Sequence, residues 1–192
     1  MATLDVLLSV ALGIGLAAAV GMRVFLPLLV MSVAAWSGHL TLAPNFQWLG
    51  TTPAMLTLAV AALLEISAYY VPGLDNLLDT IATPTALIAG TVAAAAVMTD
   101  LPPLVKWTAA IIAGGGAAGL TQGVTTLLRA KSTLGTGGIG NPIIATGELT
   151  GALGLSLLAI VMPIAALVAL ILFFWLVFRL VRRLKRRRQA AD

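Results

Sequence analysis

Two ionisable side chains stand inside long apolar runs of this 192-residue sequence, and any chemistry would begin with them. Arg23 interrupts the run 4–36 within "GMRVFLP", and Glu65 lies in "LAVAALLEISAYYVPG". A charge at the centre of a bilayer costs roughly 2.5–3.5 kcal/mol on insertion scales, so each needs a partner or a function. Two interpretations are open. The two side chains form a structural ion pair, or Glu65 titrates or binds a cation in a hydrated pathway beside Arg23.

Asp75 and Asn76 are further candidates for that pathway, because they follow the helix-breaking pair Pro72-Gly73. Either residue could cap a short helix, and the carboxylate could supply an oxygen ligand to a cation. Solvated acids in loops are the commoner case. A structural and a functional interpretation therefore stay open here as well.

A glycine-rich stretch, "STLGTGGIGNPIIATGE", contains the pattern G-x-G-x-x-G and the polar candidates Gly137 and Asn141. A dinucleotide site needs a preceding strand and a βαβ unit, whereas both flanks here are apolar helices. We predict a loop over residues 131–146, either at the membrane surface or turned towards a water-filled cavity. Glu148 follows it, and we predict that this carboxylate caps the last helix.

The sequence shows no arrangement typical of catalysis. There is no cysteine and a single histidine, His39, so neither a thiolate site nor a zinc site can form. The motifs of serine hydrolases and zinc proteases are also missing. We therefore expect a protein that is not an enzyme and that uses no metal or cofactor.

The composition indicates which solvent surrounds these residues. Hydrophobic residues make up 60% of the chain and charged residues 9%, with a mean hydropathy of +1.06. Globular domains carry about 25% charge, so this chain must bury its surface against lipid. We predict an all-α, polytopic transmembrane helical bundle with five hydrophobic segments of adequate length for a bilayer. The segments are residues 4–36, 52–71, 81–99, 103–130 and 147–181.

Three of these segments are irregular. The first is longer than a bilayer core and contains Gly21 and Pro27, which predicts an interrupted helix. The fourth contains "AGGGAAG", where glycine either permits close packing or allows unwinding. The fifth contains Pro163 without polar neighbours, and we expect a kink there rather than a hairpin. One or two more crossings result if the first or the fifth segment folds back.

Seven of the eleven basic residues follow the last apolar segment, which favours a cytoplasmic C-terminus in a bacterial inner membrane. Five crossings then place the N-terminus and the 131–146 loop outside and "TDLPPLVK" inside. The N-terminus lacks a basic region before its long apolar run, so we expect it to be retained. We expect the tail, residues 182–192, to attract anionic lipid headgroups rather than nucleic acid. The basic residues are Arg179, Arg182, Arg183, Lys185, Arg186, Arg187 and Arg188.

A weak internal repeat divides the transmembrane domain, residues 1–181, into the halves 1–99 and 103–181. The strings "GLDNLLDTIAT" and "GIGNPIIAT" share G-x-x-N and I-A-T, and each precedes an apolar helix. Such short matches between segments rich in alanine and glycine also arise by composition. Repeated halves with interrupted helices are typical of transporters, whose binding sites lie near the bilayer midplane.

Three strings taken together resemble the DUF4126 family of bacterial integral membrane proteins: "GLAAAVGMRVFLPLL", "PGLDNLLDTIATPTALIAG" and "LTQGVTTLLRAKSTLGTGGIGNPIIATGE". The resemblance covers residues 8–175 and implies a small polytopic membrane protein without an assigned activity. Our leading hypothesis is a channel or transporter for a small ion or solute, as a monomer or a homo-oligomer. The alternatives are a structural or partner-binding scaffold and a lipid-handling protein.

Overall fold

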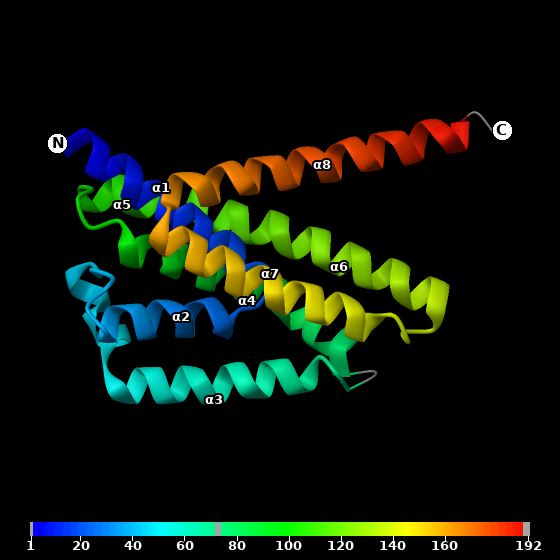
Figure 1. Cartoon of the computed structure of the whole chain (residues 1–192), viewed down its shortest axis with the longest axis horizontal. Coiled ribbons are helices and arrows are strands. Elements are labelled where there is room, and N and C mark those ends of the chain that lie inside the picture. Colours follow the sequence, from blue (N-terminus) through cyan, green and yellow to red (C-terminus); the bar gives the residue numbers. More distant parts are fainter. Residues whose placement is uncertain (1, 72–73, 190–192) are drawn as a thin grey trace.

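The computed structural model describes residues 2–71 and 74–189 and their side chains over residues 3–71 and 81–183; it is a bundle of helices (Figure 1). The predicted all-α bundle is confirmed, and the described residues form no strand. In chain order the elements are α1 (Ala2–Val20), α2 (Phe25–Trp36), the 3-10 helix η1 (Pro44–Gly50), α3 (Thr52–Ala68), α4 (Leu74–Val97), α5 (Pro103–Ala109), the π-helix η2 (Ala110–Gly115), α6 (Gly116–Thr136), α7 (Asn141–Val161) and α8 (Pro163–Gln189).

The core is built from small residues where α1, α4, η2 and α6 meet. A Cβ atom added to Gly90 would lie 2.4 Å from the Cβ of Ala118, and one added to Gly114 would lie 2.5 Å from that of Ala94. Glycine is therefore needed for close helix packing, which is the usual source of cohesion between helices in lipid. The fourth predicted segment is interrupted in its hydrogen-bond pattern by η2, but it stays helical from Pro103 to Thr136.

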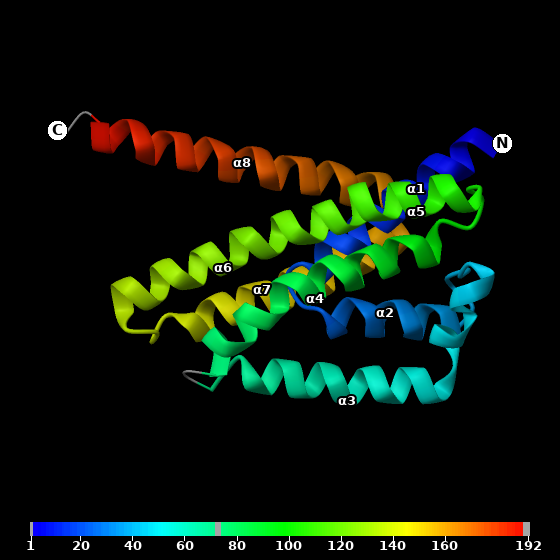
Figure 2. The same ribbon diagram turned by 180° about the vertical axis from the view of Figure 1, so that it is seen from behind.

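The first apolar segment is divided, as predicted. α1 ends at Val20, and α2 begins at Phe25 and runs back towards the end of the molecule where α1 started (Figures 1 and 2). Gly21 stands at the break because a Cβ atom there would lie 2.2 Å from the carbonyl oxygen of Ala118. The chain therefore reverses inside the bundle, against α6.

The last apolar segment forms two antiparallel helices, so the predicted kink at Pro163 is wrong. α7 ends at Val161, Met162 leaves the helical conformation with φ −140° and ψ 73°, and α8 begins at Pro163 and runs back beside α7 (Figure 1). Proline disfavours helical geometry in the preceding residue but fits the first position of a new helix. A single residue, Met162, separates the two helices, and the chain reverses there to form a hairpin.

The glycine-rich stretch is mostly helical, so the loop predicted over residues 131–146 is wrong in extent. α6 continues to Thr136, and α7 starts at Asn141. Gly137 (φ +63°) and Gly138 (φ +92°) adopt left-handed conformations, and the Gly137 N–H donates to the carbonyl oxygen of Thr133 at 2.9 Å. This is a common way to end a helix, because glycine adopts positive φ without steric cost.

The two ends of the bundle carry different connections (Figures 1 and 2). The α6–α7 turn, the end of α3, the start of α4 and the end of α8 lie at one end; the start of α1, η1 and the connection before α5 lie at the other. The prediction that the α6–α7 connection and the end of the last helix face opposite sides is therefore wrong, because the last segment forms two antiparallel helices. α4 and α7, whose first turns contain most of the two similar strings, run in the same direction, so any repeat is parallel; the division into halves stays a prediction.

Four described helical spans are long and apolar enough to cross a membrane, and a fifth is added if η1 and α3, bent by 67°, count as one. α2 is apolar but has 12 residues, too few to cross a bilayer core of about 30 Å. The chain is an integral membrane protein. Its ionisable residues inside the bundle are therefore the positions to explain.

Candidate functional site

Arg23 lies at the break between α1 and α2, and its side chain is 1% exposed. Its guanidinium donates to the carbonyl oxygen of Ala145 on α7 at 3.1 Å and lies 3.6 Å from the carboxylate of Glu148. The break leaves Arg23 outside both helices, and this position lets the side chain reach across to α7. The hydrogen bond thereby links the end of α1 to Ala145, which lies 122 residues after Arg23 in the chain.

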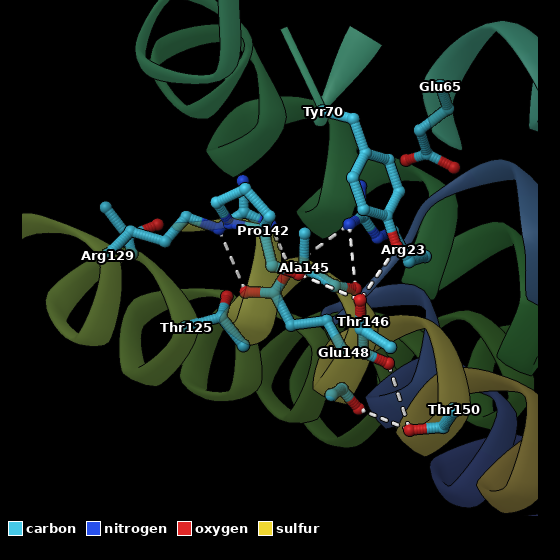
Figure 3. Close-up of polar contacts among 12 residues, drawn as sticks. Arg23, Glu65, Tyr70, Thr125, Arg129, Pro142, Ala145, Thr146, Glu148 and Thr150 are labelled. Carbon is cyan, nitrogen blue, oxygen red and sulfur yellow. Dashed lines mark hydrogen bonds and ion pairs between the residues drawn. The ribbon is translucent and has the colours of Figure 1, made fainter. Parts of the chain in front are cut away.

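Arg129 of α6 reaches the same carboxylate from another side (Figure 3). Its Nε atom donates to Oε1 of Glu148 at 3.0 Å, and its terminal NH2 group donates to Oε2. This two-pronged geometry is the strongest that an arginine and a carboxylate form. Glu148 is 5% exposed and is the eighth residue of α7, beyond the first turn. The prediction that it caps that helix is therefore wrong.

The ring of Tyr69 contacts both arginines. The Cζ atom of Arg23 is 3.8 Å from the centre of its ring, and that of Arg129 is 3.9 Å away. Both distances are well within the range of cation–π attraction, which is worth about 2 kcal/mol when the groups are desolvated. We refer to Arg23, Tyr69, Arg129 and Glu148 as the ionic cluster. It joins the α1–α2 break, the end of α3, α6 and α7.

Glu65 lies on α3 and reaches the start of α2. Its carboxylate accepts hydrogen bonds from the backbone N–H groups of Val24 at 2.8 Å and Phe25 at 3.0 Å. These groups begin α2 and have no partner within that helix. Arg23 contacts the carboxylate of Glu148, and its charge also acts on that of Glu65, so the pairing of Arg23 with Glu65 stays a prediction. Glu65 caps α2 from a neighbouring helix.

Beside this cap lies a cavity of about 470 Å³ between α2, α3 and α4. Its described lining residues are mostly apolar, and Glu65 is the one with a carboxylate. Two members of its lining, Leu64 and Ile81, are 65% and 57% exposed, so they form an outer rim. The lining residues are Val24, Phe25, Ala61, Leu64, Glu65, Ala68, Tyr69, Ile81, Ala82 and Thr85.

The other predicted site residues lie on α4, in the α6–α7 turn and at the start of α7. Asn141 is buried at the start of α7, on the face that carries Ala145 and Glu148, and its amide donates to the Thr133 hydroxyl at 3.1 Å. Gly137 belongs to the turn and has no atoms near its Cβ position. Asp75 and Asn76 belong to the first turn of α4, and their side chains lie outside the described residues.

The basic tail continues α8 without a break to Gln189. Arg179 lies 5.1 Å from the ring of Trp175, and Arg182 lies 5.0 Å from that of Phe178. Together with Arg183 they line a hollow of about 420 Å³ on the helix surface. The side chains of Lys185, Arg186, Arg187 and Arg188 lie outside the described residues.

Three members of the ionic cluster were not among the predicted site residues: Tyr69, Arg129 and Glu148. A signal for two of them exists in the sequence. Arg129 is eight positions before Gly137, and Glu148 is eight positions after Gly140, so a turn over 137–140 sets them side by side on antiparallel helices. Locating the turn within the glycine-rich stretch would have predicted the pair. No group of three or more His, Asp and Glu residues gathers as a metal site in the described part of the chain.

The comparisons with known proteins give one match. The family model described as "Domain of unknown function (DUF4126)" matches residues 10–183. No curated protein and no solved structure matches the chain.

Proposed function

Because this chain belongs to the DUF4126 family, whose description assigns no activity, we propose from its own geometry that it is a small transporter or channel for a small ion or solute. The observation that carries the proposal is the break between α1 and α2, where ionisable side chains and a cavity meet inside a membrane bundle. Broken helices form binding sites in many transporters because their ends present unpaired backbone groups to a substrate. Intramembrane ionisable groups mark such pathways for the same reason.

In this proposal the cavity is the entrance and the ionic cluster is the deep end of the pathway. Tyr69 belongs to both, since both arginines lie over its ring and it also lines the cavity. A solute that entered between α3 and α4 would meet Glu65 first and then the ring edge of Tyr69. The residues act by binding and charge compensation, and the proposal includes no catalytic step.

The basic end of α8 gives the proposal a direction. Short basic segments beside transmembrane helices face the cytoplasm, so we place the end of α8 and the α6–α7 turn there, in a bacterial inner membrane. Arg179, Arg182 and Arg183 would then contact anionic headgroups, each contributing about 1 kcal/mol to membrane attraction. The N-terminus and η1 would lie on the outer side.

A structural role is the competing function, and one observation favours it. The two-pronged contact between Arg129 and Glu148, closed further by Arg23, ties α6, α7 and the end of α1 together. A scaffold would need the cluster and would leave the cavity dry. The state of the cavity therefore separates the two functions.

Two neighbouring leucines of α3 provide the test, because the chain has no cysteine. Leu64 and Leu63 are both 65% exposed, but Leu64 lines the cavity and Leu63 does not. The variants Leu64→Cys and Leu63→Cys would be reacted in sealed proteoliposomes with a membrane-impermeant sulfonate thiol reagent. We expect labelling of the first and protection of the second, which faces lipid at the same depth.

Flux provides the second half of the test. Proteoliposomes placed in concentrated potassium chloride, choline chloride or glycerol should shrink and then re-swell faster than empty liposomes for at least one of these solutes. The faster phase should be lost when Leu64→Cys is labelled and kept in Leu63→Cys. An unlabelled cavity and swelling equal to that of empty liposomes would support the scaffold instead.

A further inference from the structure

The chemistry of the cavity beside Glu65 indicates what kind of molecule it accepts. Its walls come from three helices and are formed by alanine, leucine, isoleucine, valine and phenylalanine side chains, with Thr85 as a weakly polar addition. The hydroxyl of Thr85 donates within its own helix to the carbonyl oxygen of Ile81 at 2.8 Å. A ligand in this cavity would thus gain most of its binding energy from an apolar body.

The charge of the cavity comes from Glu65, the one charged side chain among the described lining residues. Its two oxygens offer about four acceptor positions; the N–H groups of Val24 and Phe25 use two, and that of Leu26 also acts on the carboxylate. The guanidinium of Arg23 contacts Ala145, Glu148 and Tyr69, and its charge also acts on Glu65, but Arg23 does not line the cavity. The acceptor capacity that Glu65 retains beside the cavity favours a positively charged group.

Size and access agree with this chemistry. A volume of about 470 Å³ lies within the range of roughly 300–1,000 Å³ found for small-molecule pockets. The exposed rim residues Leu64 and Ile81 leave the cavity open between α3 and α4, so a ligand would enter there. Molecules that combine an apolar body with a positive charge are amphiphilic organic cations.

We propose that this cavity binds an amphiphilic organic cation, with the apolar body between α2, α3 and α4 and the cationic group at the Glu65 carboxylate. The inference rests on the proposed function, whose substrate class it names. Glu65 is then a binding residue as well as the cap of α2. Its hydrogen bonds to the backbone hold the carboxylate at a fixed place in the wall.

Binding of tetraphenylphosphonium to the purified protein in nanodiscs tests the proposal. Tetraphenylborate has almost the same shape and the opposite charge, so it is the matched probe. We expect tetraphenylphosphonium to bind at least about tenfold more tightly than tetraphenylborate, since a hydrogen-bonded or paired charge is worth that much. Equal binding of the two probes would overturn the proposal.

Two variants locate the site, and a third is the control. Glu65→Gln should weaken tetraphenylphosphonium binding about tenfold and leave tetraphenylborate unchanged. Ala82→Phe should block both probes by filling the cavity while Glu65 stays in place, and it decides the matter if Glu65→Gln does not fold. Leu63→Phe, on the lipid-facing side of α3, should bind like the parent protein. Unchanged binding of tetraphenylphosphonium by folded Ala82→Phe would overturn the site.

The outcome is separate from that of the transport test. Binding that depends on Glu65 and Ala82, without swelling above that of empty liposomes, would keep the site and remove transport. Swelling with potassium chloride or glycerol, without any binding of tetraphenylphosphonium, would keep transport and overturn this substrate class.

Discussion

The two intramembrane glutamates of the bundle occupy contrasting regions. Glu148 lies between α6 and α7, where two arginines and a tyrosine ring surround it and its side chain is 5% exposed. Glu65 lies between α2 and α3, accepts two backbone hydrogen bonds and borders a cavity. The same residue type is thus locked by charged partners in one hairpin and left beside open space in the other. The difference teaches that partners and burial, more than the presence of a charge, decide whether a carboxylate is structural or available to a ligand.

The largest effect should come from Glu148→Gln. It would leave the guanidiniums of Arg23 and Arg129 buried without this carboxylate, and breaking a buried pair costs about 3–5 kcal/mol. We expect a fall of that size in the free energy of unfolding, measured by reversible denaturation in mixed micelles. Thr150→Val, at an exposed position two residues after Glu148 on α7, is the control. A loss below about 1 kcal/mol would contradict the structural assignment of Glu148.

The next effect concerns the break between α1 and α2, where Gly21 packs against α6. Gly21→Ala would place a Cβ atom 2.2 Å from the carbonyl oxygen of Ala118, so α1 and α6 would have to separate. Overpacking of this kind costs about 1–3 kcal/mol. Gly116→Ala is the matched control, since no atom lies within 4 Å of its Cβ position, and alanine favours a helix. If both variants unfold at the same temperature, the close approach at Gly21 does not limit stability.

Tyr69→Leu sharpens the comparison within the ionic cluster. It removes a ring that stacks on both Arg23 and Arg129, and we expect a loss of about 1–2 kcal/mol. Tyr69→Phe keeps the ring and should retain most of that stability. The measurement is again the free energy of unfolding. Equal losses in the two variants would show that the hydroxyl group, and not the stacking, matters.

The smallest effect on stability should come from Glu65→Gln. Its amide oxygen can still accept a hydrogen bond from the start of α2, so the variant loses the charge and one acceptor position. A cap of this kind is worth about 0.5–2 kcal/mol, and its conservative replacement should cost towards the lower limit. Thermal unfolding of Glu65→Gln and Glu148→Gln side by side checks the order. A larger loss for Glu65→Gln would reverse the comparison.

The sequence predicts the regular part of this fold well, because the length and apolarity of helices determine it. The break in the first segment follows from Gly21, Arg23 and Pro27 within a run too long for one crossing. The reversal at Pro163 does not follow, since proline produces a kink and a hairpin equally well and the contacts with α1 and α7 decide between them. Without this reversal, the sequence places the α6–α7 turn and the end of α8 on opposite sides of the membrane.

The sequence identified Arg23 and Glu65 as candidate site residues, but it did not indicate which residues they contact. Burial costs identified Arg23 and Glu65 from their apolar neighbours alone. Their partners depend on which helices lie together: Arg23 reaches Glu148 and the Ala145 carbonyl on α7 and also the ring of Tyr69 at the end of α3. Tyr69 resembles any interfacial aromatic residue until two arginines are placed on its faces.

The long sequence separation of Arg23 from its acceptor also sets the order in which the protein can be assembled. Arg23 leaves the ribosome 122 residues before Ala145, which at about 5–20 residues per second is a delay on the order of ten seconds. During that time the nascent chain holds an arginine whose partners on α6 and α7 have not been synthesised. The break after α1 can contact Tyr69 once α3 has been made, but its contacts with α7 must wait for the α6–α7 hairpin. The first helix to be made therefore completes its contacts only after most of the chain has been synthesised.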